Sequence, residues 1–198
     1  MDSTTLKAEF EGQLKDAEAK IAQAEEQLTK LKEYKIKLVG GLETLDLLKV
    51  YDKDIYIIDT YEGMTEPLDN DYQVINNFKM NKGEMMVTLK KVKENVLKSN
   101  YPIEKLHFIK TDVRKKNVLV ENIKQDISIL RLDTDFYDST LAILEALYFK
   151  VNKNGYLIHD DYGHWKGHYD ACKEFYIKNK INPSLIRTCR KERVEIKY

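Results

Sequence analysis

The sequence has few cysteines, no net charge and no long hydrophobic run. Its two cysteines, Cys172 and Cys189, are too few for a disulfide framework and lack metal-ligand spacing, so we expect reduced thiols. Lysine plus arginine equals aspartate plus glutamate at 33 each, which removes any global electrostatic argument for binding nucleic acid or an anionic membrane. The N-terminus has no apolar signal segment, and no window approaches the roughly 18 apolar residues of a membrane span. We therefore expect a soluble, cytoplasmic protein.

Glycine and proline are almost absent from residues 4–38, where Gly12 is the one exception. Apolar or small residues recur there at alternating spacings of four and three: Phe10, Leu14, Ala17, Ile21, Ala24, Leu28 and Leu31, with Leu38 one heptad further. This spacing is typical of the a and d positions of a coiled coil. We predict that residues 1–50 form a helical coiled-coil segment that makes the protein a homo-oligomer. A single long helix packed on its own domain is the alternative.

Residues 51–198 have a different pattern, after a break at Gly40-Gly41 and a short amphipathic helix expected over Leu42–Val50. Apolar runs of strand length occur at Ile55–Ile58, Leu106–Ile109, Ile127–Leu132 and Tyr156–Ile158. Helix-like stretches lie between and after them, at Tyr72–Phe78, Glu84–Lys98, Thr140–Phe149 and Tyr169–Lys180. Apolar strands that alternate with helices predict a parallel sheet covered on both faces, and hence a second, α/β domain.

The C-terminal residues predict a different kind of strand pairing. Ser184–Cys189 and Arg193–Tyr198 are separated by the short turn Arg190–Glu192, which indicates an antiparallel hairpin. A parallel sheet that ends in such a hairpin has the outline of the class I (Rossmann-like) methyltransferase fold, although other α/β folds share this outline.

Carboxylates gather where the predicted strands end. Asp133 and Asp135 follow the third strand and Asp160 and Asp161 the fourth; we call these four residues the acidic rim. Parallel strands end at one edge of the sheet, where open α/β folds bind ligands. Carboxylates that converge there repel each other unless a cation compensates, and their hard oxygen ligands suit Mg²⁺.

Simpler explanations exist for single residues. An aspartate after a strand is often only the N-cap of the next helix, and Asp138-Ser139-Thr140 has the composition of a cap region. Four acids at two strand ends cannot all be caps, which favours the metal site. His159, within an apolar strand, is expected to be a core histidine, while His164 and His168 are expected to line a pocket or to be exposed.

The strings DTYEGM, LRLDTDFYDSTLAILEALY, NGYLIHDDYG and GHYDACKEF resemble the macrocin O-methyltransferase family, from about Asp54 to Tyr198. That family methylates sugar hydroxyls with S-adenosylmethionine (SAM) and Mg²⁺. The resemblance implies that Asp133, Asp160 and Asp161 hold Mg²⁺ and that Asp135 is the general base. It also implies that Asp59 contacts the SAM ribose.

The family's glycine-rich loop, which holds the amino-acid end of SAM, is not recognisable here. Gly40 and Gly41 are the remaining candidates for that contact, and the first strand of the fold is missing or altered. Two hypotheses follow. One is a SAM- and Mg²⁺-dependent sugar O-methyltransferase; the other is a catalytically inactive, methyltransferase-derived interaction protein that oligomerises through its N-terminal helix.

Overall fold

The structure is a computed structural model that describes residues 10–25, 28, 53–99 and 101–198. The chain divides into two units, Met1–Lys53 and Asp54–Tyr198. Residues 10–25 of the first unit are helical, as predicted, and Phe10, Leu14 and Ile21 are exposed on that helix. Gly40, Gly41 and the helix expected over 42–50 lie outside the described residues. The coiled coil therefore stays a prediction.

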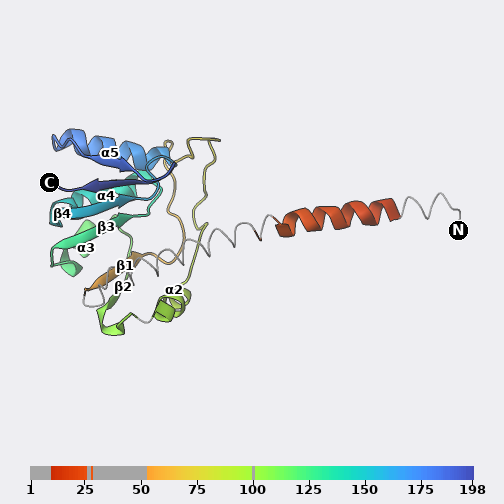
Figure 1. Cartoon of the computed structure of the whole chain (residues 1–198), viewed down its shortest axis with the longest axis horizontal. Helices are drawn as coiled ribbons and strands as arrows, with labels where there is room; N and C mark the ends of the chain where they lie inside the picture. Colours follow the sequence, from red (N-terminus) through yellow and green to blue (C-terminus); the bar gives the residue numbers. More distant parts are fainter. Residues whose placement is uncertain (1–9, 26–27, 29–52, 100) are drawn as a thin grey trace, which may run out of the picture. The chain divides into compact units, whose positions relative to one another are not determined.

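The second unit contains helices and strands that alternate along the chain (Figure 1). The strands are β1 (Ile55–Asp59), β2 (Leu106–Lys110), β3 (Ile127–Leu132), β4 (Val151–His159), β5 (Leu185–Arg187) and β6 (Arg193–Ile196). The helices are α2 (Leu89–Val96), α3 (Lys116–Asn122), α4 (Tyr137–Leu147) and α5 (Lys166–Lys178). Short 3₁₀ turns are η1 (Leu97–Ser99), η2 (Ile103–Lys105) and η3 (Tyr148–Lys150). Every predicted strand is present, and the predicted C-terminal hairpin is β5–β6.

The strands form two hydrogen-bonded sheets rather than the single sheet that we expected. β1 pairs in parallel with β2, and the second sheet has the order β3-β4-β6-β5. In the second sheet β3 and β4 are parallel, whereas β6 is antiparallel to both β4 and β5. Among the described residues, β1 and β3 each have one edge that pairs with no other strand. No strand before β1 is described that could join the two sheets.

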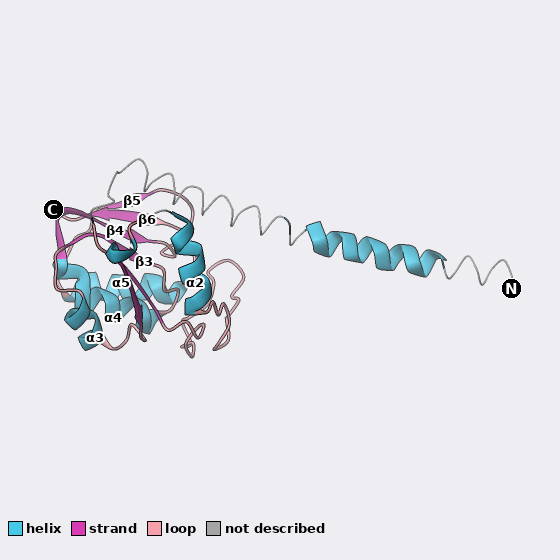
Figure 2. Cartoon of the chain, turned by 90° about the horizontal axis from the view of Figure 1, so that it is seen from below, coloured by secondary structure: helices cyan, strands magenta, loops and turns pink. Residues whose placement is uncertain are grey.

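The core lies between the second sheet and the helices α3, α4 and α5 (Figure 2). Leu132 of β3, Leu144 of α4 and Leu157 of β4 are fully buried there. Burial of each such side chain contributes about 1.5–3 kcal/mol relative to exposure. Ile58 of β1 also packs against this core, which gives the smaller sheet a tertiary contact with the rest of the unit. None of the helices in the described part of the chain is long and apolar enough to cross a membrane.

The helix predicted over Tyr72–Phe78 is wrong. That segment consists of turns and a single bridge between Gln73 and Trp165. The Val74 N–H donates to the His164 carbonyl at 2.9 Å, and the Lys166 N–H donates to the Tyr72 carbonyl at 2.9 Å. Because these backbone groups bond to the loop between β4 and α5, they are not available for an intrahelical ladder. The apolar spacing alone could not reveal this long-range pairing.

Candidate metal and cofactor site

Three of the predicted carboxylates meet where two parallel strands end. β3 and β4 are paired with Leu132 opposite His159, so Asp133 and Asp160 follow the two strands at one edge of the sheet. The Asp160 N–H donates to the Leu132 carbonyl at 3.1 Å, which holds the strand ends together. One carboxylate oxygen from each of Asp133, Asp160 and Asp161 lies within 4.8 Å of the others. The geometry thus satisfies the proximity that a shared ion requires.

Helix capping does not explain the acidic rim. The N-cap residue of α4 is Phe136 and that of α5 is Trp165, and neither cap makes a side-chain hydrogen bond. Asp138, which the sequence placed in a cap region, lies inside the first turn of α4. The rim carboxylates are therefore not used as caps of the helices that follow them.

Arg131 faces the rim and offsets part of its charge. One guanidinium nitrogen lies 2.9 Å from a carboxylate oxygen of Asp133, and the other donates to Asp160 at 2.9 Å. This contact could not be predicted from the sequence, because the side chain of a strand residue must reach past the strand end to form it. A guanidinium carries a single positive charge, so the four-carboxylate rim retains an excess of negative charge.

Asp161 is the buried carboxylate of the rim, and Asp135 beside it is partly buried. Burial raises the pKa of Asp135 well above its usual range, and the nearby Asp161, Asp133 and Asp160 carboxylates raise it further. Burial also raises the pKa of Asp161, against the effect of its hydrogen bond with Asp135. A protonated Asp135 therefore donates to the Asp161 carboxylate. The backbone of Asp135 has φ of +30°, a left-handed conformation that costs free energy in a residue with a Cβ and that concentrates at functional sites.

The donor set of the rim fits a magnesium ion. All of its candidate ligand atoms are carboxylate oxygens, which Mg²⁺ prefers over nitrogen or sulfur. Burial is the main cause of the raised pKa values of Asp135 and Asp161, and the neighbouring carboxylates of the rim raise them further. A divalent cation would relieve this repulsion. Metal binding itself stays a prediction.

Gly163 of the D-D-Y-G string holds the loop after β4 close to the C-terminal hairpin. Its N–H donates to the Lys191 carbonyl at 2.8 Å. A Cβ at this position would lie 2.4 Å from the Arg190 carbonyl oxygen, closer than any side chain tolerates. The glycine therefore lets the loop that carries Asp161 dock on the turn between β5 and β6.

Asp71 is a buried carboxylate that the sequence analysis missed. Its Oδ1 accepts the Tyr137 N–H at 2.7 Å and its Oδ2 accepts the Leu68 N–H at 2.8 Å. It thereby ties the segment after β1 to the first residue of α4, two positions beyond Asp135. We assign Asp71 as a positioning residue for the rim. The residues around Asp71 in the sequence do not indicate its contact with Tyr137, which is 66 positions away.

Asp59 is the last residue of β1, which agrees with its predicted position at the end of the first strand. It is exposed, and its Oδ1 accepts the Tyr61 N–H and a longer bond of 3.4 Å from the Thr60 hydroxyl. Both of these bonds use the same oxygen. Gly40 and Gly41, the other predicted cofactor contacts, lie outside the described residues, so their contribution stays a prediction.

Comparison with solved structures identifies the fold. The O-methyltransferase NovP superposes with a TM-score of 0.65 at 24% identity, over 77% of this chain and 63% of that chain. The calicheamicin methyltransferase CalS11 gives 0.58 at 18% identity, over 72% and 60%. At these identities the similarity shows the fold alone, which is the α/β fold of class I methyltransferases.

Sequence comparison adds two curated relatives. Demethyldecarbamoylnovobiocin O-methyltransferase of Streptomyces niveus is 27% identical over 139 residues, which are 69% of this chain and 52% of that protein. The 8-demethyl-8-(2,3-dimethoxy-alpha-L-rhamnosyl)-tetracenomycin-C 4'-O-methyltransferase of Streptomyces olivaceus is 26% identical over 122 residues, 61% of this chain and 44% of that protein. The chain thus spans about half the length of these relatives.

The model of one protein family matches residues 40–190, a range that includes Asp59, Asp71 and the whole acidic rim. The match covers about three-quarters of the 198 residues. The chain therefore belongs to the macrocin-O-methyltransferase (TylF) family.

Proposed function

We propose that this chain is a SAM- and Mg²⁺-dependent O-methyltransferase that acts on a sugar hydroxyl. The observation that carries the proposal is the convergence of Asp133, Asp160 and Asp161 beside the strained, partly buried Asp135. Membership of the family supports methyl transfer, and the Streptomyces olivaceus relative is named for methylation of a rhamnosyl group. The sugar acceptor and the metal requirement are part of the proposal.

Each site residue has a distinct role in this proposal. Asp133, Asp160 and Asp161 would hold Mg²⁺, which when bound lowers the pKa of a coordinated hydroxyl and orients it. Asp135 would accept the proton of the sugar hydroxyl as it attacks the methyl group. Asp135 can act as a base only in its ionised form, so it depends on neutralisation of the neighbouring negative charge. Asp59 would bond a ribose hydroxyl of SAM, and Gly40-Gly41 would approach its amino-acid end.

Mg²⁺ should stabilise the protein through the rim. At about one hundred times its dissociation constant, a ligand that binds only the folded state adds about 2.7 kcal/mol to the free energy of unfolding. We expect Asp160→Asn to abolish the Mg²⁺-dependent rise in melting temperature, because it removes a charged ligand. Asp126→Asn, an exposed aspartate remote from the rim, is the matched control and should retain the full shift. An unchanged shift in Asp160→Asn would place the Mg²⁺ site elsewhere.

SAM should bind weakly and through Asp59. Loss of about three hydrogen bonds to the amino-acid end, each worth about 1 kcal/mol, weakens a micromolar cofactor to a dissociation constant of about 0.1 mM. Calorimetric titration of the full chain with SAM, with and without Mg²⁺, measures this affinity. Asp59→Ala should eliminate binding, whereas Asp69→Ala, at an exposed aspartate, should not. Micromolar affinity would contradict the expected weakening.

The inactive interaction protein is the second candidate function. It is favoured by the division of the strands into two sheets, with β1 and β3 each unpaired on one edge among the residues that the structure describes. The titration separates the candidates. Absence of SAM binding at millimolar concentration, together with intact Mg²⁺-dependent stabilisation, would favour the inactive protein over the enzyme.

We also propose that the N-terminal helix makes the chain a homo-oligomer. Its apolar side chains at Phe10, Leu14, Ile21 and Leu28 are exposed, and such a stripe is buried most simply against a second copy. The double variant Ile21→Glu/Leu28→Glu should sediment as a monomer, because charges at a and d positions oppose association. Glu18→Lys, on the same helix outside the stripe, should leave the oligomer intact. A monomeric wild-type chain at tens of micromolar would refute the proposal.

A further inference from the structure

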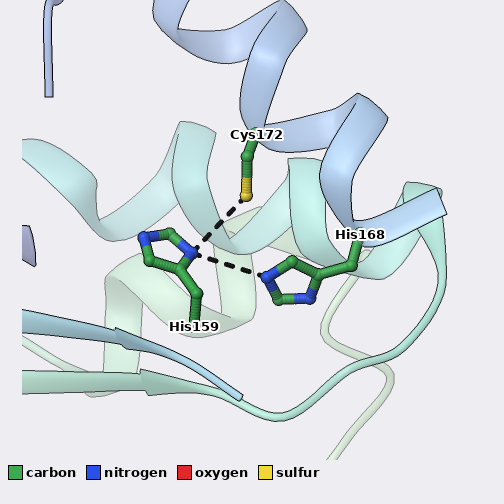
Figure 3. A group of neighbouring side chains, drawn as sticks. All are labelled: His159, His168 and Cys172. Carbon is green, nitrogen blue, oxygen red and sulfur yellow. Dashed lines mark hydrogen bonds between the residues drawn. The ribbon is translucent and has the colours of Figure 1, made fainter. Parts of the chain in front are cut away.

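A second group of potential ligands lies inside the core and shares no residue with the acidic rim. It consists of His159, the last residue of β4, and of His168 and Cys172 on α5 (Figure 3). All three side chains are fully buried, with no exposed surface. His168 and Cys172 are four residues apart and therefore lie on the same face of the helix, which faces the strand end. Because His159 belongs to a strand and the other two residues belong to a helix, the spacing of the histidines along the sequence did not reveal the cluster.

Two of the three distances within this cluster match those between ligands of one metal ion. His159 Nδ1 lies 3.5 Å from His168 Nε2 and 3.5 Å from Cys172 Sγ, and the three atoms all lie within 4.8 Å of one another. A nitrogen pair 3.5 Å apart is long for a hydrogen bond, since N–H donors usually lie about 2.7–3.2 Å from their acceptors. Tetrahedral zinc, with Zn–N of about 2.0–2.1 Å and Zn–S of about 2.3 Å, separates neighbouring ligand atoms by about 3.3–3.6 Å.

The outer nitrogen of each histidine is held by a hydrogen-bonding partner. His159 Nε2 lies 3.1 Å from the Tyr176 hydroxyl, and His168 Nδ1 lies 3.3 Å from the Thr140 hydroxyl. This arrangement directs His168 Nε2 toward His159 Nδ1, and His159 Nδ1 toward both His168 and Cys172, as the sticks in Figure 3 show. Metal-binding histidines are oriented in this way, with one ring nitrogen on the ion and the other on a polar neighbour.

The surroundings also supply the charge that a divalent ion requires. Glu195 is buried behind Tyr176, and its carboxylate accepts the hydroxyl of Tyr176 at 2.5 Å and that of Tyr148 at 2.7 Å. One carboxylate and one cysteine thiolate together balance two positive charges. A buried ion is tolerated only when its charge is compensated in this way. An imidazole–thiolate donor set selects Zn²⁺ rather than Mg²⁺.

We propose that His159, His168 and Cys172 form a buried Zn²⁺ site, distinct from the carboxylate site of the rim. The three side chains supply two nitrogens and one sulfur, and a small exogenous donor such as water completes the tetrahedron. Because Cys172 binds as the thiolate, its thiol proton is released to solvent when the ion enters. The ion joins the end of β4 to α5, so it stabilises the element that also carries Asp160 and Asp161.

Cobalt substitution tests the site directly. The full chain is unfolded, refolded with Co²⁺ in the presence of excess Mg²⁺ to occupy the rim, and passed through a desalting column. We expect one retained Co²⁺ per chain and a thiolate-to-cobalt charge-transfer absorption band. Cys172→Ser should lose the band, whereas Cys189→Ser, which alters the exposed cysteine, should keep it. Asp160→Asn should also keep it, because that residue belongs to the rim.

Two results would overturn the proposal: a refolded wild-type chain without a thiolate–cobalt band, or a band that survives in Cys172→Ser. The first result needs no variant, so it applies even if Cys172→Ser fails to fold. Tyr176→Phe provides a milder variant that keeps all three ligands. It should weaken Co²⁺ binding by about 10–100-fold in competition with a chelator, which is the usual effect of removing a partner of a metal-bound histidine. Unchanged affinity in Tyr176→Phe would contradict the assigned orientation of His159.

Discussion

Asp135→Asn is expected to raise the melting temperature of the metal-free protein at pH 8 and, in the same variant, to abolish most methyl transfer. The folded-state pKa of Asp135 is raised by burial and by the Asp161, Asp133 and Asp160 carboxylates. The folded protein therefore binds a proton that the unfolded chain releases, and its stability declines as the pH rises above the unfolded pKa of about 4. Asparagine is neutral at every pH and can still donate to Asp161.

The expected gain in stability at pH 8 is about 2 kcal/mol, or roughly 4–8 °C in melting temperature for a unit of this size. The gain should shrink as the pH falls toward 4, where Asp135 is protonated in both states. Thermal melts of wild type and variant across this pH range in a chelating buffer measure it. Asp126→Asn, at an exposed aspartate, should show no such dependence. A variant less stable than wild type at pH 8 would show that Asp135 is not under electrostatic strain.

The expected loss of methyl transfer follows from the proposed role of Asp135 as the general base. Removal of a positioned general base lowers a rate by about 10²–10⁴-fold. The methyl-transfer rate of Asp135→Asn, measured with saturating Mg²⁺ and SAM on an accepted sugar substrate, should fall by that factor while Mg²⁺ still stabilises the protein. A retained rate would remove Asp135 from the proposed mechanism without affecting the metal site. Higher stability together with lower activity is the combination expected of a strained functional residue.

The rim was predictable from the sequence because its members follow two neighbouring strands. The apolar runs that became β3 and β4 are buried on the core side, so their ends were visible in the sequence. Parallel pairing then placed Asp133 next to Asp160 without further information. Asp59 was predictable for the same reason, because it ends the apolar run of β1.

Other features could not be predicted because their partners are distant in the sequence. α3 was missed because seven residues with a short Val118–Val120 apolar run show no helical period. β4 begins at Val151, earlier than predicted, and it includes the polar residues Asn152–Asn154, which are exposed. The single predicted sheet divides in two because a hydrophobic pattern identifies strands but does not identify their neighbours. The buried group around His159 depends on side chains from β4, α4, α5 and β6, which no local pattern connects.

Asp71→Ala is expected to destabilise the unit by about 3–6 kcal/mol, because two backbone N–H groups lose a charged, buried acceptor and each such bond contributes about 1.5–3 kcal/mol. The affected donors are Tyr137, at the start of α4, and Leu68, in the segment after β1. The lost bond at Tyr137 frees the backbone that holds Asp135 in its left-handed conformation. Denaturant unfolding measures the loss of stability, and the Mg²⁺-dependent thermal shift reports whether the rim is still assembled.

Gly167→Ala is expected to perturb the Asp71 carboxylate from α5. A Cβ at this position would lie 1.9 Å from Asp71 Oδ1, so either α5 or the Asp71 side chain must move. We expect Gly167→Ala to destabilise the unit, and the double variant Asp71→Ala/Gly167→Ala to be more stable than the sum of the two single effects predicts, because the clash disappears with the carboxylate. Gly12→Ala is the control, because a Cβ added at Gly12 would meet open space. This variant should be neutral or slightly stabilising. Strict additivity in the double variant would show that Gly167 does not pack on Asp71.

An unperturbed melting temperature in Asp71→Ala would contradict the role of Asp71. It would show that the segment after β1 is not held to α4 by this carboxylate, and the orientation of Asp135 would then need another cause.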